Sequence, residues 1–235
     1  MKILRKIGKI IFSIFFTVFL SLLILLIIFL DFLKYEKLKN VAIKLIENQV
    51  NITEGQKRLI LEYLKFECQN KEKISFNFGI NITINCSIIK DLSEKNLIFY
   101  LSNLAFDYLY FKNYSCNFKE CFEKKEFTYF ISSQFYNEMK SYFYLILVLT
   151  IFFGAMYFFL IETIENKLLS FGTIFIFVGI SYFLIDFIPN FLNIQVLQLK
   201  EIILEIKESS KFLLYFLIIG VLLLVPYFIL KFKKH

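Results

Sequence analysis

The sequence is poor in several residues on which common binding and catalytic chemistry depends. It has no tryptophan, two prolines and seven glycines, and its one histidine is His235. Without an internal histidine, the chain lacks the commonest general base and the usual cysteine–histidine zinc arrangement. It also has no glycine-rich phosphate loop, and the scarcity of proline and glycine excludes a flexible linker. We therefore expect no metal, no cofactor, and no catalytic nucleophile or base.

Apolar residues are abundant, because 58% of the chain is hydrophobic and the mean hydropathy is +0.64. Uncharged runs at 10–30, 141–161, 168–185 and 212–230 predict four transmembrane helices, of which the third is extended to 168–188. Each has about 20 residues, enough to cross a hydrocarbon core of ~30 Å at about 1.5 Å per residue. The chain is therefore expected to be an integral membrane protein with a four-transmembrane-helix bundle.

The net charge of +7 is concentrated beside the predicted membrane ends. The basic residues that precede the first span and follow the last are Lys2, Arg5, Lys6, Lys9, Lys231, Lys233 and Lys234. Such residues fix orientation by staying on the cytoplasmic side. We expect a plasma-membrane protein with both basic ends, 1–9 and 231–235, in the cytoplasm and no nucleic-acid partner. A polybasic patch that binds lipid is the alternative interpretation of these charges.

This topology places residues 31–140 outside the cytoplasm, with an outer amphipathic segment at 189–211 and a cytoplasmic turn at 162–167. We expect 31–140 to be a mixed α+β, disulfide-stapled extracytoplasmic domain. Its predicted helices cover 33–49, the segment from a Thr53–Gln56 capping box to Cys68, and 94–112.

One segment of the outer domain carries a strand pattern. Residues 74–88, ISFNFGINITINCSI, alternate apolar with small or polar side chains. Period-two alternation is typical of a half-buried strand. A strand needs a partner, for which we expect 127–132, FTYFIS, and we allow for a bulge or bend at Gly79.

The four cysteines, Cys68, Cys86, Cys116 and Cys121, all lie in the outer domain. An even number on the oxidising side predicts two disulfides, and of three possible pairings we favour Cys68–Cys86 with Cys116–Cys121. The alternative is outward redox chemistry like that of the disulfide-bond-forming membrane proteins. Those use a CxxC pair, whereas the spacing here is CxxxxC.

Four N-glycosylation sequons also lie in the outer domain, at Asn51, Asn81, Asn85 and Asn113. They predict a glycoprotein if the cell has the machinery. A chance product of the Asn-rich composition is the alternative.

Two functions remain open. The first is an outer domain that binds a partner protein or envelope component; a homo-oligomer is also possible. Its candidate contact surface is formed by Tyr100, Tyr108, Tyr110 and Tyr114, and the equal alternative is that these rings pack against the membrane-facing core. The second is a membrane enzyme acting at the outer face on lipid, lipoprotein or thiol-disulfide substrates, for which Asp186 and Tyr182 are the possible contacts. The plan of four spans with an outward domain after the first resembles that of the intramolecular lipoprotein transacylases. This resemblance implies outward histidines, which the chain lacks, so no residue is carried over.

Overall fold

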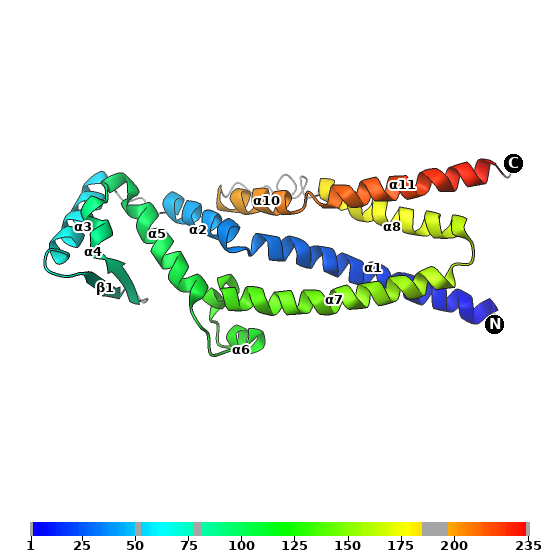
Figure 1. The fold of residues 1–235 in the computed structure, drawn as a ribbon, viewed down its shortest axis with the longest axis horizontal. Coiled ribbons are helices and arrows are strands. Elements are labelled where there is room, and N and C mark those ends of the chain that lie inside the picture. Colours follow the sequence, from blue (N-terminus) through cyan, green and yellow to red (C-terminus); the bar gives the residue numbers. More distant parts are fainter. Residues whose placement is uncertain (1, 50–52, 78–80, 185–196, 234–235) are drawn as a thin grey trace. The chain divides into compact units, whose positions relative to one another are not determined.

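The computed structural model describes residues 2–49, 53–77, 81–184 and 197–233 (Figure 1). The chain divides into two compact units. One, here called the membrane unit, comprises Met1–Phe32 and Glu138–His235, and the other, the 33–137 unit, comprises Leu33–Asn137. Each is described by itself.

The membrane unit is built from long apolar helices. They are α1 (Lys2–Phe32), α7 (Ser133–Leu160, whose first residues belong to the 33–137 unit), α8 (Ile164–Leu184), α10 (Leu197–Ser209) and α11 (Leu213–Phe232). Four stretches of the described residues are long and apolar enough to cross a membrane: Arg5–Phe32, Ser133–Leu160, Ile164–Phe183 and Ile202–Phe232. Their length and composition indicate a membrane protein. The fourth stretch includes the end of α10, within the segment for which sequence indicated an outer amphipathic helix.

The turn between α7 and α8 is shorter than the 162–167 expected from sequence. Only residues 161–163 separate the two helices. The Thr163 hydroxyl accepts a hydrogen bond from the Asn166 N–H at 3.3 Å, which is the bond of an N-cap residue. Helix α8 therefore starts at Ile164, and its charged first turn belongs to the helix rather than to a loop.

Helices α8 and α11 approach each other closely because glycines line their contact. A Cβ on Gly179 would lie 2.5 Å from the Leu217 backbone nitrogen, and one on Gly220 would lie 2.7 Å from the Ile176 nitrogen. Lipid gives apolar helices no hydrophobic reason to associate, so close backbone packing must hold them together. Gly172 of α8 lies in the same contact, where an added Cβ would come within 2.8 Å of the Leu224 side chain.

The aromatic ring of Phe16 joins α1 to α7 and α8. Phe16 of α1 lies against Gly154 of α7, where an added Cβ would come within 2.8 Å of the ring. The same ring is 5.5 Å from Phe171 of α8, centroid to centroid. The buried cluster comprises Phe16, Leu20, Ile24, Tyr157, Ile161, Val178 and Leu213.

The 33–137 unit is mainly helical, so the expected mixed α+β domain is not supported. Its elements are α2 (Tyr35–Gln49), α3 (Glu54–Glu67), β1 (Lys73–Asn77), β2 (Asn81–Asn85), α4 (Cys86–Asp91), α5 (Glu94–Phe111), α6 (Phe118–Glu123) and the 3₁₀ helix η1 (Phe127–Ile131). The Thr53–Gln56 capping box is confirmed at the start of α3. Helix α2 does not simply continue α1, because residues 33–34 interrupt the helix.

The prediction of one long strand at 74–88 with 127–132 as its partner is wrong. Strands β1 and β2 pair with each other, antiparallel, with Ile74 opposite Ile84 and Ser75 opposite Thr83. Every pair joins residues of the same parity, so the alternation of 74–77 continues unchanged in 81–85. Alternation alone therefore cannot separate a hairpin from one strand. Residues 86–88 start α4, and 127–131 form η1.

The core of the 33–137 unit lies between α3, the hairpin, α4 and α5. Its buried members are Leu61, Leu64, Cys68, Ile74, Ile84, Cys86, Ile89 and Leu97. Aliphatic residues surround a pair of cysteines there, so a covalent bond runs through the centre of this core.

The contact between α8 and α11 predicts that Gly179→Ala is destabilising. The new methyl group would meet the backbone of α11, which cannot move aside as a side chain can, so we expect a loss of about 2 kcal/mol or more. Thermal unfolding of the purified protein in detergent would show a lower Tm. Gly8→Ala is the control in the same unit, because its methyl group would make an ordinary contact, 3.7 Å from Leu160. An unchanged Tm for Gly179→Ala would contradict the contact.

Candidate binding surface

Two disulfides account for all four cysteines. Cys68 at the end of α3 bonds to Cys86 at the start of α4, and Cys116 bonds to Cys121 of α6. These are the pairings favoured from sequence. All four side chains are buried, and no cysteine is free, so the structure offers no thiol for exchange chemistry in this state.

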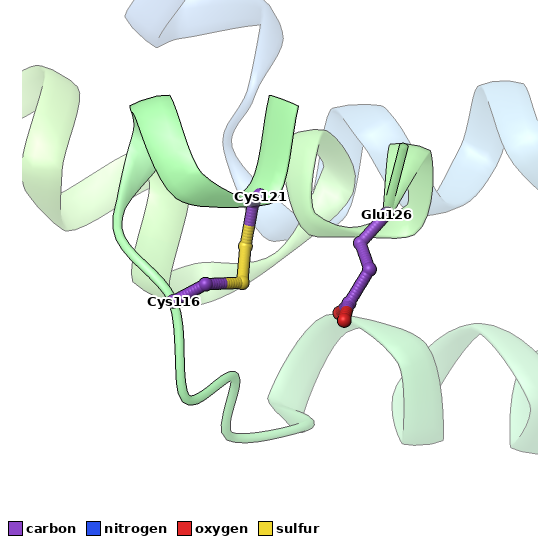
Figure 2. A group of neighbouring side chains, drawn as sticks. All are labelled: Cys116, Cys121 and Glu126. Atoms are coloured by element: carbon purple, nitrogen blue, oxygen red, sulfur yellow. A yellow bond between two sulfur atoms is a disulfide. The ribbon is translucent and has the colours of Figure 1, made fainter. Parts of the chain in front are cut away.

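One group of side chains has the composition of a metal site. Ligand atoms of Cys116, Cys121 and Glu126 lie within 4.8 Å of one another. Figure 2 shows why they are not a ligand set here: the two sulfur atoms are bonded to each other, and the Glu126 carboxylate lies beside that bond. A metal would need thiolates, which the disulfide removes.

Side chains around this second disulfide hold it against the start of α7. The Gln134 side chain accepts a hydrogen bond from the Tyr114 N–H at 3.0 Å and donates one to the Cys116 carbonyl at 3.2 Å. The Phe118 ring stacks on Phe135, with centroids 6.0 Å apart. The loop closed by the disulfide is therefore tied to the first turn of a span-length helix.

The sequons fall in different settings. Asn113 is exposed after α5. Asn85 is exposed, but its Oδ1 accepts hydrogen bonds from the Ser87 N–H and hydroxyl, so it also caps α4. Asn81 is the first residue of β2. Asn51 lies outside the described residues.

Of the two contacts named for the enzyme hypothesis, only Tyr182 lies among the described residues. Tyr182 lies near the end of α8, partly buried against the cluster of the membrane unit. Asp186 lies outside the described residues.

The tyrosine surface expected from sequence is largely internal. Tyr110 and Tyr114 are buried, and Tyr100 packs against the core. Tyr110 contacts Tyr35 and Phe106, and Tyr114 contacts Tyr129, with centroids 5.1–5.9 Å apart in these clusters. Only Tyr108 of the four is exposed. These rings stabilise the unit instead of presenting a contact surface.

A different apolar surface lies on α3. Leu59, Tyr63 and Phe66 are 68%, 55% and 66% exposed. Their spacing of four and three residues places them on one side of the helix. Leu61 and Leu64 occupy the opposite side and are buried. We call the three exposed residues the α3 stripe.

Both ends of α3 are fixed. The Thr53 side chain and Gln56 form the capping box at its start, and Cys68 bonds to Cys86 at its end. On the helix, Arg58 Nε and Glu62 Oε1 form an ion pair at 2.9 Å beside the stripe. The stripe is therefore held on a helix that needs no ordering before contact, which lowers the entropic cost of binding.

This surface was missed from sequence, although a signal was present. The sequence predicts LILEYLKFEC only as the end of a helix at Cys68, although the segment is apolar on two sides of that helix. An amphipathic helix of a globular unit normally has a single apolar side.

A polar cluster joins α2 to α5 next to the buried tyrosines. The Tyr35 hydroxyl donates to Asp107 Oδ1 at 2.6 Å, and Lys39 Nζ donates to the Tyr35 oxygen at 2.7 Å and to Asp107 Oδ1 at 2.9 Å. Burial raises the pKa of Tyr35, and the bond to Asp107 raises it further. Burial lowers the pKa of Lys39, but its bonds to Tyr35 and Asp107 outweigh burial, so that pKa is raised overall. A tyrosine held protonated is a structural hydrogen-bond donor and a poor base.

Comparison of the chain with models of known protein families, with curated proteins and with solved structures finds no match.

Removing the Cys68–Cys86 bond should cost more stability than removing the other disulfide. Its loop has a sequence separation of 18, against 5 for Cys116–Cys121. Chain entropy then predicts losses of about 3 and about 2 kcal/mol for the two serine double variants. Denaturant unfolding in detergent, followed by circular dichroism, measures both. The opposite order of losses would contradict a central role for the first bond.

Lys39→Met should destabilise the α2–α5 contact by about 1–2 kcal/mol, because Asp107 and Tyr35 lose a charged partner. In the native protein, both raised pKa values mean that the folded state holds protons more tightly than the unfolded state. The contribution of the cluster is therefore complete below about pH 10 and falls as the pH rises through the raised values.

Unfolding measured between about pH 8 and 11 should show a weaker pH dependence for Lys39→Met than for the native protein. The exposed Lys119 supplies the control, since Lys119→Met should leave stability and its pH dependence unchanged. Equal effects of the two changes would show that the cluster contributes nothing.

Proposed function

We propose that the chain is a multi-pass membrane protein whose 33–137 unit lies outside the cytoplasm and binds a partner protein through the α3 stripe. The observation that carries this proposal is the three exposed apolar side chains, Leu59, Tyr63 and Phe66, on a helix fixed at both ends.

The location is supported by chemistry at several points of the chain. The 33–137 unit contains both disulfides, and such bonds persist in oxidising compartments. The basic residues lie before the first span and after the last, where cytoplasmic residues are expected. With four spans, the unit between the first and second then lies outside. The exposed sequon at Asn113 is compatible with this side of the membrane.

The mode of binding follows from the spacing of the stripe. Side chains at i, i+4 and i+7 are the anchors by which a helix lies in an apolar groove of a partner. Two of the three anchors are aromatic, and aromatic residues dominate the energy of many interfaces. Nearby charges of both signs, including the Arg58–Glu62 pair, would form a polar rim. The partner is therefore expected to be a protein with an apolar groove.

Site-specific photocrosslinking in intact cells that naturally make the protein tests this proposal. A photoreactive phenylalanine analogue replaces Tyr63 in the full chain, and the adduct should contain one defined protein. Leu59→Ala with Phe66→Ala should weaken formation of the adduct by about tenfold or more, since each anchor contributes at least about 1 kcal/mol. The protein with the analogue at Tyr63, with and without Leu59→Ala and Phe66→Ala, must retain the two disulfides, as measured by peptide mapping without reduction.

Phe127→Ala is the matched control, because Phe127 is 64% exposed in the same unit but lies on η1. It should leave the adduct unchanged. The proposal fails if the adduct survives loss of Leu59 and Phe66, or if the crosslinked protein is a second copy of this chain, which would make the stripe a self-association surface.

A further inference from the structure

A cavity of about 300 Å³ lies in the membrane unit where α1 begins and α7 gives way to α8. Its polar lining consists of Arg5, Lys6 and Lys9 from α1, Glu162 from the turn and Asn166 from α8. Leu160 and Ile161 supply the apolar part. The lining thus carries three cations against one carboxylate.

Arg5 is held in a defined position within this cavity. Its Nη1 lies 2.8 Å from Glu162 Oε1, and its Nε donates to the Leu160 carbonyl at 3.3 Å. The Leu160 carbonyl is at the end of α7, where backbone acceptors have no partner within the helix. These two contacts join the start of α1 to the α7–α8 turn along one wall of the cavity.

Unlike Arg5, Lys6 and Lys9 have no carboxylate partner among the described residues that line this cavity. Within the part of the chain that the structure describes, the Glu162 carboxylate forms its ion pair with Arg5, and Lys6 and Lys9 form no ion pair. Two ammonium groups so close together raise the local potential, and an anion between them would relieve their repulsion. The Asn166 side chain can donate further hydrogen bonds to oxygen atoms of that anion.

The position of the cavity along the span-length helices indicates which kind of anion it would meet. It lies beside the first residues of one span-length stretch, Arg5–Phe32, the last residues of Ser133–Leu160 and the first of Ile164–Phe183. These are the depths at which lipid headgroups lie. Basic pockets between membrane helices are suited to phosphate headgroups, and the apolar Leu160 and Ile161 are suited to the start of the lipid chains.

We infer that this cavity binds a phosphate anion and that its source is the headgroup of an anionic phospholipid. Lys6 and Lys9 contact the phosphate, and Arg5, paired with Glu162, lines the same site. This inference is independent of the proposed partner-binding function, because it concerns the membrane unit alone.

Native mass spectrometry of the full chain in detergent tests the inference directly. The protein is mixed separately with phosphatidylglycerol, phosphatidylcholine and inorganic phosphate. We expect retention of phosphatidylglycerol in preference to the zwitterionic lipid. Lys6→Gln with Lys9→Gln should weaken that binding by roughly ten- to thirtyfold, because each loses a charge near the headgroup.

The control removes the same charge elsewhere, with Lys231→Gln and Lys233→Gln at the end of α11, and should change binding by less than about twofold. Both double variants must unfold at the native Tm without added lipid. The inference is overturned if the two double variants lose phosphatidylglycerol equally or if the zwitterionic lipid binds as well. It is also overturned if inorganic phosphate occupies the site as tightly as the lipid, since the source would then be soluble phosphate.

Discussion

Hydrocarbon offers no hydrogen bonds to a polypeptide backbone, and this constraint determines the helical structure of the membrane unit. Each apolar stretch satisfies its own amide groups as a helix, and the connections between helices are confined to the ends. Because lipid is as apolar as leucine, the helices associate by close packing instead of by hydrophobic exclusion. Gly179 and Gly220 let α8 and α11 meet at their backbones, and Gly154 receives the ring of Phe16. The cationic cavity follows from the same constraint, since charged side chains must collect where the apolar stretches stop.

The 33–137 unit is stabilised in a different way, by a buried core and two disulfides. It has a modest core, and a domain of about 100 residues gains much from covalent bonds that restrict its unfolded chain. The Cys68–Cys86 bond passes through that core and fixes the end of α3. One consequence is a helix with one apolar side buried and another exposed. The stability of the unit and its proposed binding surface thus depend on the same bond.

The sequence predicted what depends on composition and local spacing. The apolar stretches, the capping box of α3 and the cysteine pairing are properties of short segments or of a small number of choices. It did not predict what depends on tertiary contacts. The hairpin has the same alternation as a single strand, and Tyr110 and Tyr114 are buried in part by rings of α2 and η1, which are distant in sequence. The α3 stripe was not predicted, because the sequence alone does not show which of the two apolar sides of α3 the rest of the unit covers.

The arrangement of the chain across the membrane is the claim on which the functional account rests. Single cysteines at Asn96, exposed on α5, and at Asn166, exposed on α8, would report it through a membrane-impermeant maleimide applied to intact cells. If the 33–137 unit lies outside the cytoplasm, Asn96→Cys is labelled at once and Asn166→Cys is labelled only after the membrane is permeabilised. Labelling of Asn166→Cys in intact cells, with Asn96→Cys protected, would contradict the account.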